Sequence, residues 1–150
     1  YINSKDVAFY QQIYNALGGM MWMEAKLDSS SYYFKKSLIE LEKADESDLM
    51  NALFRPALIK MNLSVLKNAL GENQEAISLS QESIKGFEAY IEKSTDEFRI
   101  LSAKRHRATA IENLLIEFYI FTINIIEGFG GIEIVFFSEL KITKILCFVT

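Results

Sequence analysis

The single histidine is the first side chain to consider for chemistry. His106 is the only imidazole among 150 residues, so the residue count excludes a metal site built on several histidines. A Ser–His–acid triad needs only one histidine, but the chain contains no G-x-S-x-G elbow for a nucleophile. Three cations, Lys104, Arg105 and Arg107, flank the imidazole in sequence and favour a position in solvent. We therefore expect His106 to be a surface residue.

A glycine cluster near the carboxyl end is the second candidate. Gly128, Gly130 and Gly131 have a spacing that resembles a phosphate-binding loop. The lysine and the Ser/Thr of a P-loop are absent, and Glu133 occupies the last glycine position of a dinucleotide-binding fingerprint. The cluster therefore predicts a hinge or a turn rather than a nucleotide site.

The remaining reactive groups do not form a catalytic set in sequence. Cys147 is the only cysteine, which excludes an internal disulfide and a zinc cluster of cysteines. Carboxylates such as Asp45, Glu46 and Asp48 fall in a polar joint, and no Glu-x-x-His pair of a di-metal bundle occurs. The sequence thus predicts a protein that is not an enzyme and that uses neither a metal nor a cofactor.

The charge of the chain indicates which partners to expect. Sixteen basic and twenty acidic side chains leave a net charge of −4, which argues against a nucleic-acid binder. Arg99 and residues 104–107 form a local basic patch that could meet an acidic peptide, a phosphate or a membrane surface. Because Glu112 and Glu117 follow and no aromatic residues are interleaved for base stacking, we expect a solvated helix face.

Composition and periodicity together predict an all-α fold. Half of the residues are apolar, which supplies a core, whereas glycine and proline together make up only 8 of 150 residues. That scarcity argues against a turn-rich sandwich or barrel. Apolar residues recur at helical spacing in five segments, at residues 6–25, 31–42, 49–70, 74–91 and 95–126.

Local signals mark the ends of these segments. Asp28 or Ser29 is placed to cap the second segment, and Gly71 is placed to end the third. Pro56 lies inside the third segment, where it should kink or split the helix. The sequence Ser-Thr-Asp-Glu at 94–97 matches a capping box and predicts the start of the fifth helix.

The first segment contains an apolar stripe and a glycine pair. The stripe consists of residues at helical spacing, namely Phe9, Ile13, Leu17, Met20 and Met21. The pair Gly18-Gly19 costs about 1 kcal/mol per residue inside a helix, so it needs a structural reason. We expect a second helix to approach closely there, because glycine has no Cβ in the way.

The chain also repeats itself with an offset of 46 residues. Residues 14–38 can be laid on residues 59–84, and each unit is then a helix, a tight joint and a second helix. The alignment matches Leu17 with Leu63, Ala25 with Gly71, Phe34 with Ser80, and Ser37 with Ser83.

These two units resemble the tetratricopeptide repeat (TPR) family. Leu17-Gly18 looks like the Leu-Gly step of the family's first helix, and Phe34 falls on the aromatic position of its second helix. Residues 68–77, NALGENQEAI, look like the turn between the two helices, with Gly71 at the turn and Ala76 at the crossing. The resemblance covers residues 8–92 and extends to 95–127 by helix length alone.

The sequence departs from the family pattern at several points. The proline that often closes a repeat is missing, and the spacing of 46 exceeds the usual 34. Ser30 and Ser64 replace a small alanine and a glycine. The resemblance nevertheless implies antiparallel helical hairpins stacked as a TPR-like right-handed solenoid over residues 1–127, followed by an apolar segment at 128–150.

The resemblance also implies a function class. Stacked hairpins of this kind form a groove that holds a peptide or a partner helix, so we expect a non-catalytic protein-interaction module, part of a larger regulatory protein. The groove-facing candidates come from the first helix of each unit: Gln12, Asn15, Trp22, Met23, Met61, Val65, Asn68, Glu112 and Tyr119. Trp22 is of particular interest because tryptophan is enriched at binding hot spots, although core packing is its commoner role.

The apolar C-terminal region leaves two other functions open. Residues 114–126 are apolar on nearly all sides, and the runs after residue 131 favour a β-hairpin or a continued helix. This region could seal against another copy of the chain as an oligomerisation element, or lie at a membrane surface as part of a sensor. The stretch 114–126 is short for a bilayer span and carries Glu117, so membrane association is the less favoured alternative.

The sequence says little about the compartment. The cytoplasm is favoured, and the single cysteine does not exclude the periplasm. The chain starts at Tyr1 rather than methionine, so we expect a fragment or a processed form, and no signal peptide opens it.

Overall fold

The computed structural model describes residues 4–128, and this part of the chain is helical with no strand. The all-α prediction is therefore confirmed for these residues. The predicted turn at 128–131, the β-hairpin or helix beyond it, and Cys147 lie outside the described residues. In chain order the elements are α1 (Ser4–Met23), α2 (Leu27–Leu41), the π-helical turn η1 (Met50–Phe54), α3 (Arg55–Ala69), α4 (Asn73–Lys93) and α5 (Glu97–Gly128).

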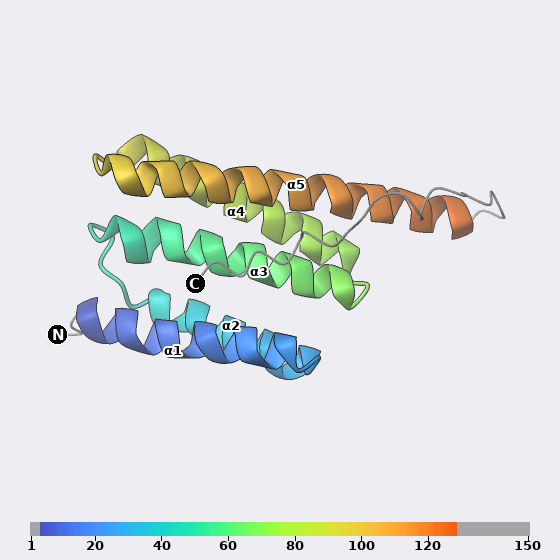
Figure 1. The fold of residues 1–150 in the computed structure, drawn as a ribbon, viewed down its shortest axis with the longest axis horizontal. Helices are drawn as coiled ribbons and strands as arrows, with labels where there is room; N and C mark the ends of the chain where they lie inside the picture. The colour runs from blue at the N-terminus through green and yellow to red at the C-terminus, as the bar shows by residue number, and fades with distance from the viewer. Residues whose placement is uncertain (1–3, 129–150) are drawn as a thin grey trace.

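The helices form two antiparallel hairpins and one additional helix. In Figure 1, α1, α3 and α5 run in one direction, whereas α2 and α4 run in the opposite direction. Helix α1 packs on α2, α3 packs on α4, and α5 packs along α4 and also contacts α3. The two hairpins meet mainly where α2 contacts α3. As a result α1 and α5 lie at opposite edges of the molecule (Figure 1).

Two apolar clusters hold these elements together. The first joins the α1/α2 hairpin to α3 through Val7, Phe34, Leu41, Ile59, Leu63 and Leu66. The second joins η1, α3, α4 and α5 through Phe54, Ala57, Met61, Phe87, Tyr90, Ala103 and Ala110. Helix α3 contributes to both clusters, so each hairpin buries apolar surface that it could not bury alone.

The two hairpin joints have the same backbone geometry. Ala25 (φ 57°) and Gly71 (φ 78°), which the 46-residue offset matches, are the two described residues with positive φ. The Lys26 N–H donates to the Met21 carbonyl, and the Glu72 N–H donates to the Lys67 carbonyl, both at 2.9 Å. These bonds form the six-to-one Schellman closure of a helix end. Each hairpin therefore turns in the same way, although alanine is less suited than glycine to this conformation.

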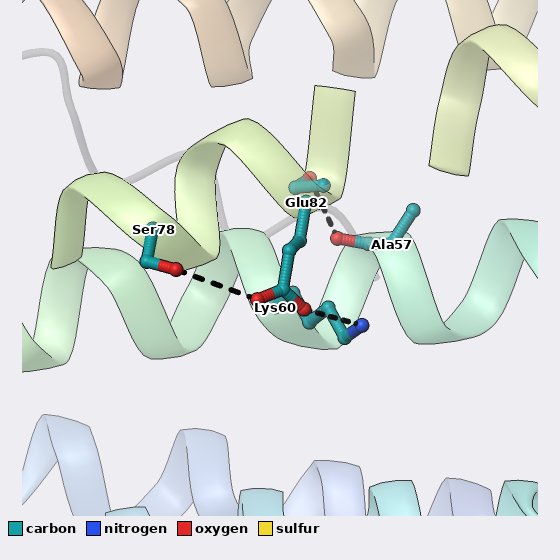
Figure 2. A network of polar contacts seen from close by, with 5 residues as sticks. Ala57, Lys60, Ser78 and Glu82 are labelled. Carbon is teal, nitrogen blue, oxygen red and sulfur yellow. Dashed lines mark hydrogen bonds and ion pairs between the residues drawn. The ribbon is translucent and has the colours of Figure 1, made fainter. Parts of the chain in front are cut away.

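Serine hydrogen bonds repeat with the same offset. The Ser37 hydroxyl of α2 donates to the Gln11 carbonyl of α1 at 2.9 Å. The Ser83 hydroxyl of α4 donates to the Ala57 carbonyl of α3 at 2.7 Å, and a dashed line in Figure 2 ends at this carbonyl. On the surface of the second hairpin, Lys60 pairs with Glu82 at 2.8 Å (Figure 2). The repeat found in the sequence thus corresponds to a repeated contact in space.

The matched serines predict matched losses of stability. Ser37→Ala and Ser83→Ala should each lower the free energy of unfolding by about 1 kcal/mol, because each removes the buried bond from a hydroxyl to a carbonyl. Ser37→Ala also removes the weaker bond that Gln11 Nε2 donates to Ser37 at 3.3 Å, so its loss should be at least as large. Chemical denaturation followed by circular dichroism measures the change. Ser78→Ala is the control, since Ser78 is exposed and the hydrogen bond that its hydroxyl donates to Glu82 is long, at 3.5 Å (Figure 2). Equal stability of all three variants and the unmodified chain would contradict this prediction.

The glycine in the middle of α1 allows the close approach that we expected. A Cβ built at Gly18 would lie 2.7 Å from a ring carbon of Phe34, which is inside van der Waals contact. The Ser30 hydroxyl donates to the Gly18 carbonyl at 2.8 Å beside this contact. The ring of Phe34 therefore lies directly on the α1 backbone.

The proline and the caps act near the predicted positions. Pro56 lies in the first turn of α3, and the π-helical turn η1 ends two residues before it. The backbone stays helical through Phe54 and Arg55, so near the proline the helix changes its hydrogen-bond pattern and is not split into two. Helix α5 begins one residue after Asp96, whose carboxylate accepts from the Arg99 N–H at 3.1 Å. Helix α2 begins at Leu27 rather than after the predicted cap at Asp28 or Ser29, because the Schellman turn already reverses the chain.

Candidate functional site

The histidine is buried, so the prediction of a surface residue is wrong. The imidazole of His106 stacks on the Phe87 ring with centroids 5.8 Å apart, and it meets the edge of Phe54 at 5.7 Å. Burial lowers the pKa of His106, which favours the neutral imidazole. Helical geometry explains the difference, because residue 106 faces α4 while Lys104 and Arg105 are exposed on the outer side of α5. An imidazole enclosed by aromatic rings is a packing element rather than a general base.

Glu117 is a buried acid that the sequence reading did not identify as such. Its side chain is 1% exposed, and its Oε1 accepts a hydrogen bond from the Ser80 hydroxyl of α4 at 3.0 Å. Burial raises the pKa of Glu117, while the hydrogen bond from Ser80 and the neighbouring Ser64 hydroxyl, which itself donates to the Met61 carbonyl at 2.8 Å, act in the opposite direction. The signal was present in the spacing, because residues 103, 106, 110, 113 and 117 form one face of α5 and all are buried.

The space for Glu117 comes from a difference between the two hairpins. In the first hairpin the buried ring of Phe34 packs on Gly18, which is also buried. In the second hairpin Ser80 takes the place of Phe34 and Ser64 takes the place of Gly18, and both serines are buried. Two serines leave room where the first hairpin has an aromatic ring, and the Glu117 carboxyl approaches Ser80 there. The arrangement joins α5 to the second hairpin, and we assign it a structural role.

A surface hollow lies where α5 extends past the joint between α3 and α4. It has a volume of about 600 Å³ and is lined by residues 71–75 together with Phe121, Asn124 and Ile125. The Lys67 ammonium lies 2.5 Å from a Glu72 carboxylate oxygen and 3.0 Å from one of Glu75. These pairs raise the pKa of Lys67 and lower that of Glu72. One ammonium therefore faces two carboxylates, so these three groups together carry a net charge of −1.

Metal binding finds no support over residues 4–128. No cluster of three or more His, Cys, Asp or Glu side chains that could hold an ion occurs in this range. The two titratable groups buried most deeply on α5, His106 and Glu117, face protein on their side of the helix and do not line the hollow.

The predicted apolar stripe of α1 is exposed in part: Phe9, Ile13 and Met20 face outward, whereas Leu17 and Met21 are partly buried. Phe9 is 60% exposed and Met23 is 72% exposed, and they belong to a line of exposed residues that we name the α1 stripe: Phe9, Ile13, Ala16, Met20 and Met23. The side of α1 that is buried carries Val7, Gln11 and Gly18 instead. Helix α2 approaches that side because Gly18 permits close contact, so the larger apolar residues remain on the surface.

The predicted groove residues are distributed over several environments. Four of them, Gln12, Met23, Glu112 and Tyr119, are exposed. Four others are partly buried: Asn15, Trp22, Val65 and Asn68. Trp22 packs against the first apolar cluster, which corresponds to the core role weighed for it. The amide oxygens of Asn15 and Asn68 are buried and have no hydrogen-bond partner in the described part of the chain.

Met61 is a correction to the predicted groove. It is 4% exposed and belongs to the second apolar cluster with Ala103 and Ala110 of α5. The face of α3 that carries Met61 is covered by the packing of α4 and α5. Met61 therefore stabilises the contact between helices and does not line an exposed groove.

Helix α5 exposes a second apolar surface. Leu115 is 65% exposed, and Phe98, Leu101, Ile111, Phe118 and Ile125 are exposed as well. By length and composition the segment Glu97–Ile125 could cross a membrane, with a mean hydropathy of 1.3 over its most apolar 18 residues, of which 22% are buried in the protein. The core helix of a water-soluble protein meets the same criterion, and Glu117 ties α5 to α4 within this segment.

Comparisons with protein families, curated proteins and solved structures give no relative from which a function could be inferred. The exposed apolar surfaces of α1 and α5 are therefore the basis for the proposal below. No family model matches the chain, and neither the curated proteins nor the solved structures contain a significant match.

Proposed function

We propose that this protein is a non-catalytic interaction module that binds an amphipathic helix of a partner protein on the α1 stripe. The observation that carries the proposal is the outward orientation of Phe9, Ile13, Met20 and Met23, on a helix whose buried side is lined by Gln11 and Gly18. An apolar helix face of this extent in contact with water is typical of an interaction surface.

The chemistry of the stripe suits a helical ligand. Its residues recur at intervals of three and four, so a partner helix with apolar residues at the same spacing can lie along it. Methionine side chains are flexible and polarisable, which lets such a surface adapt to different partner side chains. At one end of the stripe Glu24 already pairs with Lys26 at 2.6 Å, so charge contributes little there.

The repeated architecture supports the same class of function. The two hairpins share their joint geometry and their serine contacts, which favours a stacked helical-repeat protein of the TPR-like, right-handed solenoid type. In that arrangement the first helices of successive units form the binding face, and the exposed candidates Gln12 and Met23 lie on that helix of the first unit. We include Asn15 and Asn68 at the inner margin of this face.

A peptide selection tests the proposal. Amphipathic helices chosen from a displayed library against the intact chain should bind, and Met23→Glu should weaken that binding at least about 10-fold, because a carboxylate would be desolvated in an apolar contact. Titration calorimetry with the selected peptide measures the dissociation constant. Phe98→Glu is the matched control, since Phe98 is equally exposed but lies on α5.

Two results would refute the α1 assignment. One is a selection that yields no helical peptide for this chain, although the same library yields peptides that bind a known helix-binding protein. The other is equal binding by Met23→Glu and the unmodified chain together with loss of binding by Phe98→Glu, which would move the partner site to α5.

A further inference from the structure

The outer side of α5 has the residue pattern of a coiled-coil helix. Starting the heptad at Leu101, positions a are residues 101, 108, 115 and 122, and positions d are residues 104, 111, 118 and 125, all of them exposed. Six of these eight are apolar, and we name them the α5 seam: Leu101, Ala108, Ile111, Leu115, Phe118 and Ile125. Helix α4 covers the opposite side of α5, where Ala103, His106 and Ala110 are buried.

Two opposite charges flank the seam at equivalent positions. Arg105 and Glu112 both occupy position e and are exposed, and neither side chain forms an ion pair in the described part of the chain. They are seven residues apart, which is about 10.5 Å along the helix axis, so they cannot reach one another within α5. A second helix with the reverse order of charges would satisfy both.

We propose that this second helix is α5 of another copy of the chain, packed antiparallel along the seam about a two-fold axis. In the register that centres on Thr109 and Ala110, Leu101 faces Phe118 of the second copy, and Ala108 faces Ile111. Leu115 faces the aliphatic stem of Lys104, whose ammonium reaches water at the edge. Arg105 then lies beside Glu112 of the second copy, and the symmetry repeats this pair on the other half.

The charges select this register over its neighbours. A shift by one heptad would place Glu112 beside Glu112 of the second copy, and like charges across a seam destabilise it. A parallel arrangement would place Lys104 against Lys104 in a d layer and would align the basic residues 99–107 of both copies. The antiparallel register is the one that pairs Arg105 with Glu112.

The seam is long enough and accessible enough for this contact. In this register residues 97–122 of the two α5 helices overlap, which is 26 residues, between the three and four heptads that a stable coiled coil needs. Ile125 extends beyond this overlap. Helices α5 and α1 lie at opposite edges of the molecule (Figure 1), so their exposed surfaces can be occupied at once. This inference goes beyond the proposed function, because it assigns a different surface and a different partner.

Light scattering on the intact chain is the first test. The unmodified protein should show the mass of a dimer over a wide concentration range, and Leu115→Glu should show the mass of a monomer. Leu115 is well exposed, so the variant should keep its helical circular dichroism and its thermal midpoint. Ile39→Glu is the control, because Ile39 is exposed on α2, away from the seam, and this variant should remain a dimer.

A charge exchange tests the register. Arg105→Glu places two acidic pairs at the interface, and Glu112→Arg places two basic pairs there, so each variant alone should dimerise roughly 10- to 30-fold more weakly. Mixed in equal amounts, the two variants should form a heterodimer, because every pair is again of opposite charge. The double variant R105E/E112R should recover the dimer, a result that the parallel arrangement does not predict.

Four outcomes would overturn the proposal. One is an unmodified chain that is monomeric at every concentration, and another is a dimer that Leu115→Glu does not weaken. The third is a loss of helical structure in Leu115→Glu, which would show that another segment of the same chain covers the seam. Pelleting of the unmodified chain with phosphatidylcholine–phosphatidylglycerol vesicles, abolished by Leu115→Glu and without self-association, would identify a lipid surface as the occupant and would equally overturn the dimer.

Discussion

Replacing Gly18 by leucine is expected to lower the free energy of unfolding by at least about 2 kcal/mol. Even the first carbon of a new side chain would lie 2.7 Å from the Phe34 ring, and that ring is 2% exposed within the first apolar cluster. Neither helix can retreat without losing the Ser30 and Ser37 hydrogen bonds between α1 and α2. The loss should exceed the gain in helix propensity that any residue brings in place of glycine.

Denaturant unfolding of Gly18→Leu, Phe34→Ala and the double variant measures this contact directly. Phe34→Ala alone should cost roughly 3 to 5 kcal/mol because it empties a core position. In the double variant the new leucine occupies part of the vacated space, so the combined loss should be smaller than the sum of the single losses by about 1 kcal/mol or more. Ala16→Leu places the same leucine side chain at an exposed position of α1 and should change stability by less than about 0.5 kcal/mol. Strict additivity of the two single variants would show that the residues do not meet.

The second large effect concerns the pH dependence of stability. Burial raises the pKa of Glu117 in the folded protein above its value in the unfolded chain. The stabilising contribution of this group is therefore complete below the unfolded pKa, and it is lost as the pH rises through the folded pKa. Above that pH the folded state must keep a charged carboxylate buried beside two serines. We expect stability to fall over this range.

Glu117→Gln should remove this loss. The amide retains an acceptor for the Ser80 hydroxyl and carries no charge, so the variant should be more stable than the unmodified chain at pH 8 by about 1 kcal/mol or more. Near pH 4 the two proteins should have similar stability. Thermal unfolding as a function of pH provides the comparison, and Glu112→Gln serves as the matched exposed control on the same helix. Parallel pH profiles for the unmodified chain and Glu117→Gln would contradict a buried, proton-bearing carboxyl.

Much of the fold follows from local sequence features. Apolar periodicity and the scarcity of glycine and proline predicted five helical segments, and the structure has helices in all five. The 46-residue offset correctly matched Ala25 with Gly71 and Ser37 with Ser83, because a helix end and a hydroxyl on a helix face depend on residues close in sequence. Boundaries such as the start of α2 were less accurate, since a turn closed by backbone hydrogen bonds does not require a capping side chain.

The environment of single side chains was harder to predict. His106, surrounded by cations in sequence, is buried because three consecutive helix positions point in three different directions. Met61 and the α1 stripe both show that periodicity does not predict burial. Met61 is covered by α4 and α5, whereas the five residues of the α1 stripe remain exposed. Periodicity identifies a face, but the packing of the neighbouring helix determines whether that face is covered.

The sequence by itself determined the helices, their joints and the pairing of each hairpin, because these depend on backbone preferences and on contacts between adjacent segments. The tertiary structure alone decided which faces are buried. It placed Gly18 and Gln11 of α1 against α2, and it brought Glu117 of α5 next to Ser80 of α4. It also left the α1 stripe and the α5 seam exposed to water. The physical reason is that the burial of a side chain depends on contacts between segments that are distant in sequence. One glycine or one pair of serines can change how closely two helices pack, and therefore which residues are buried.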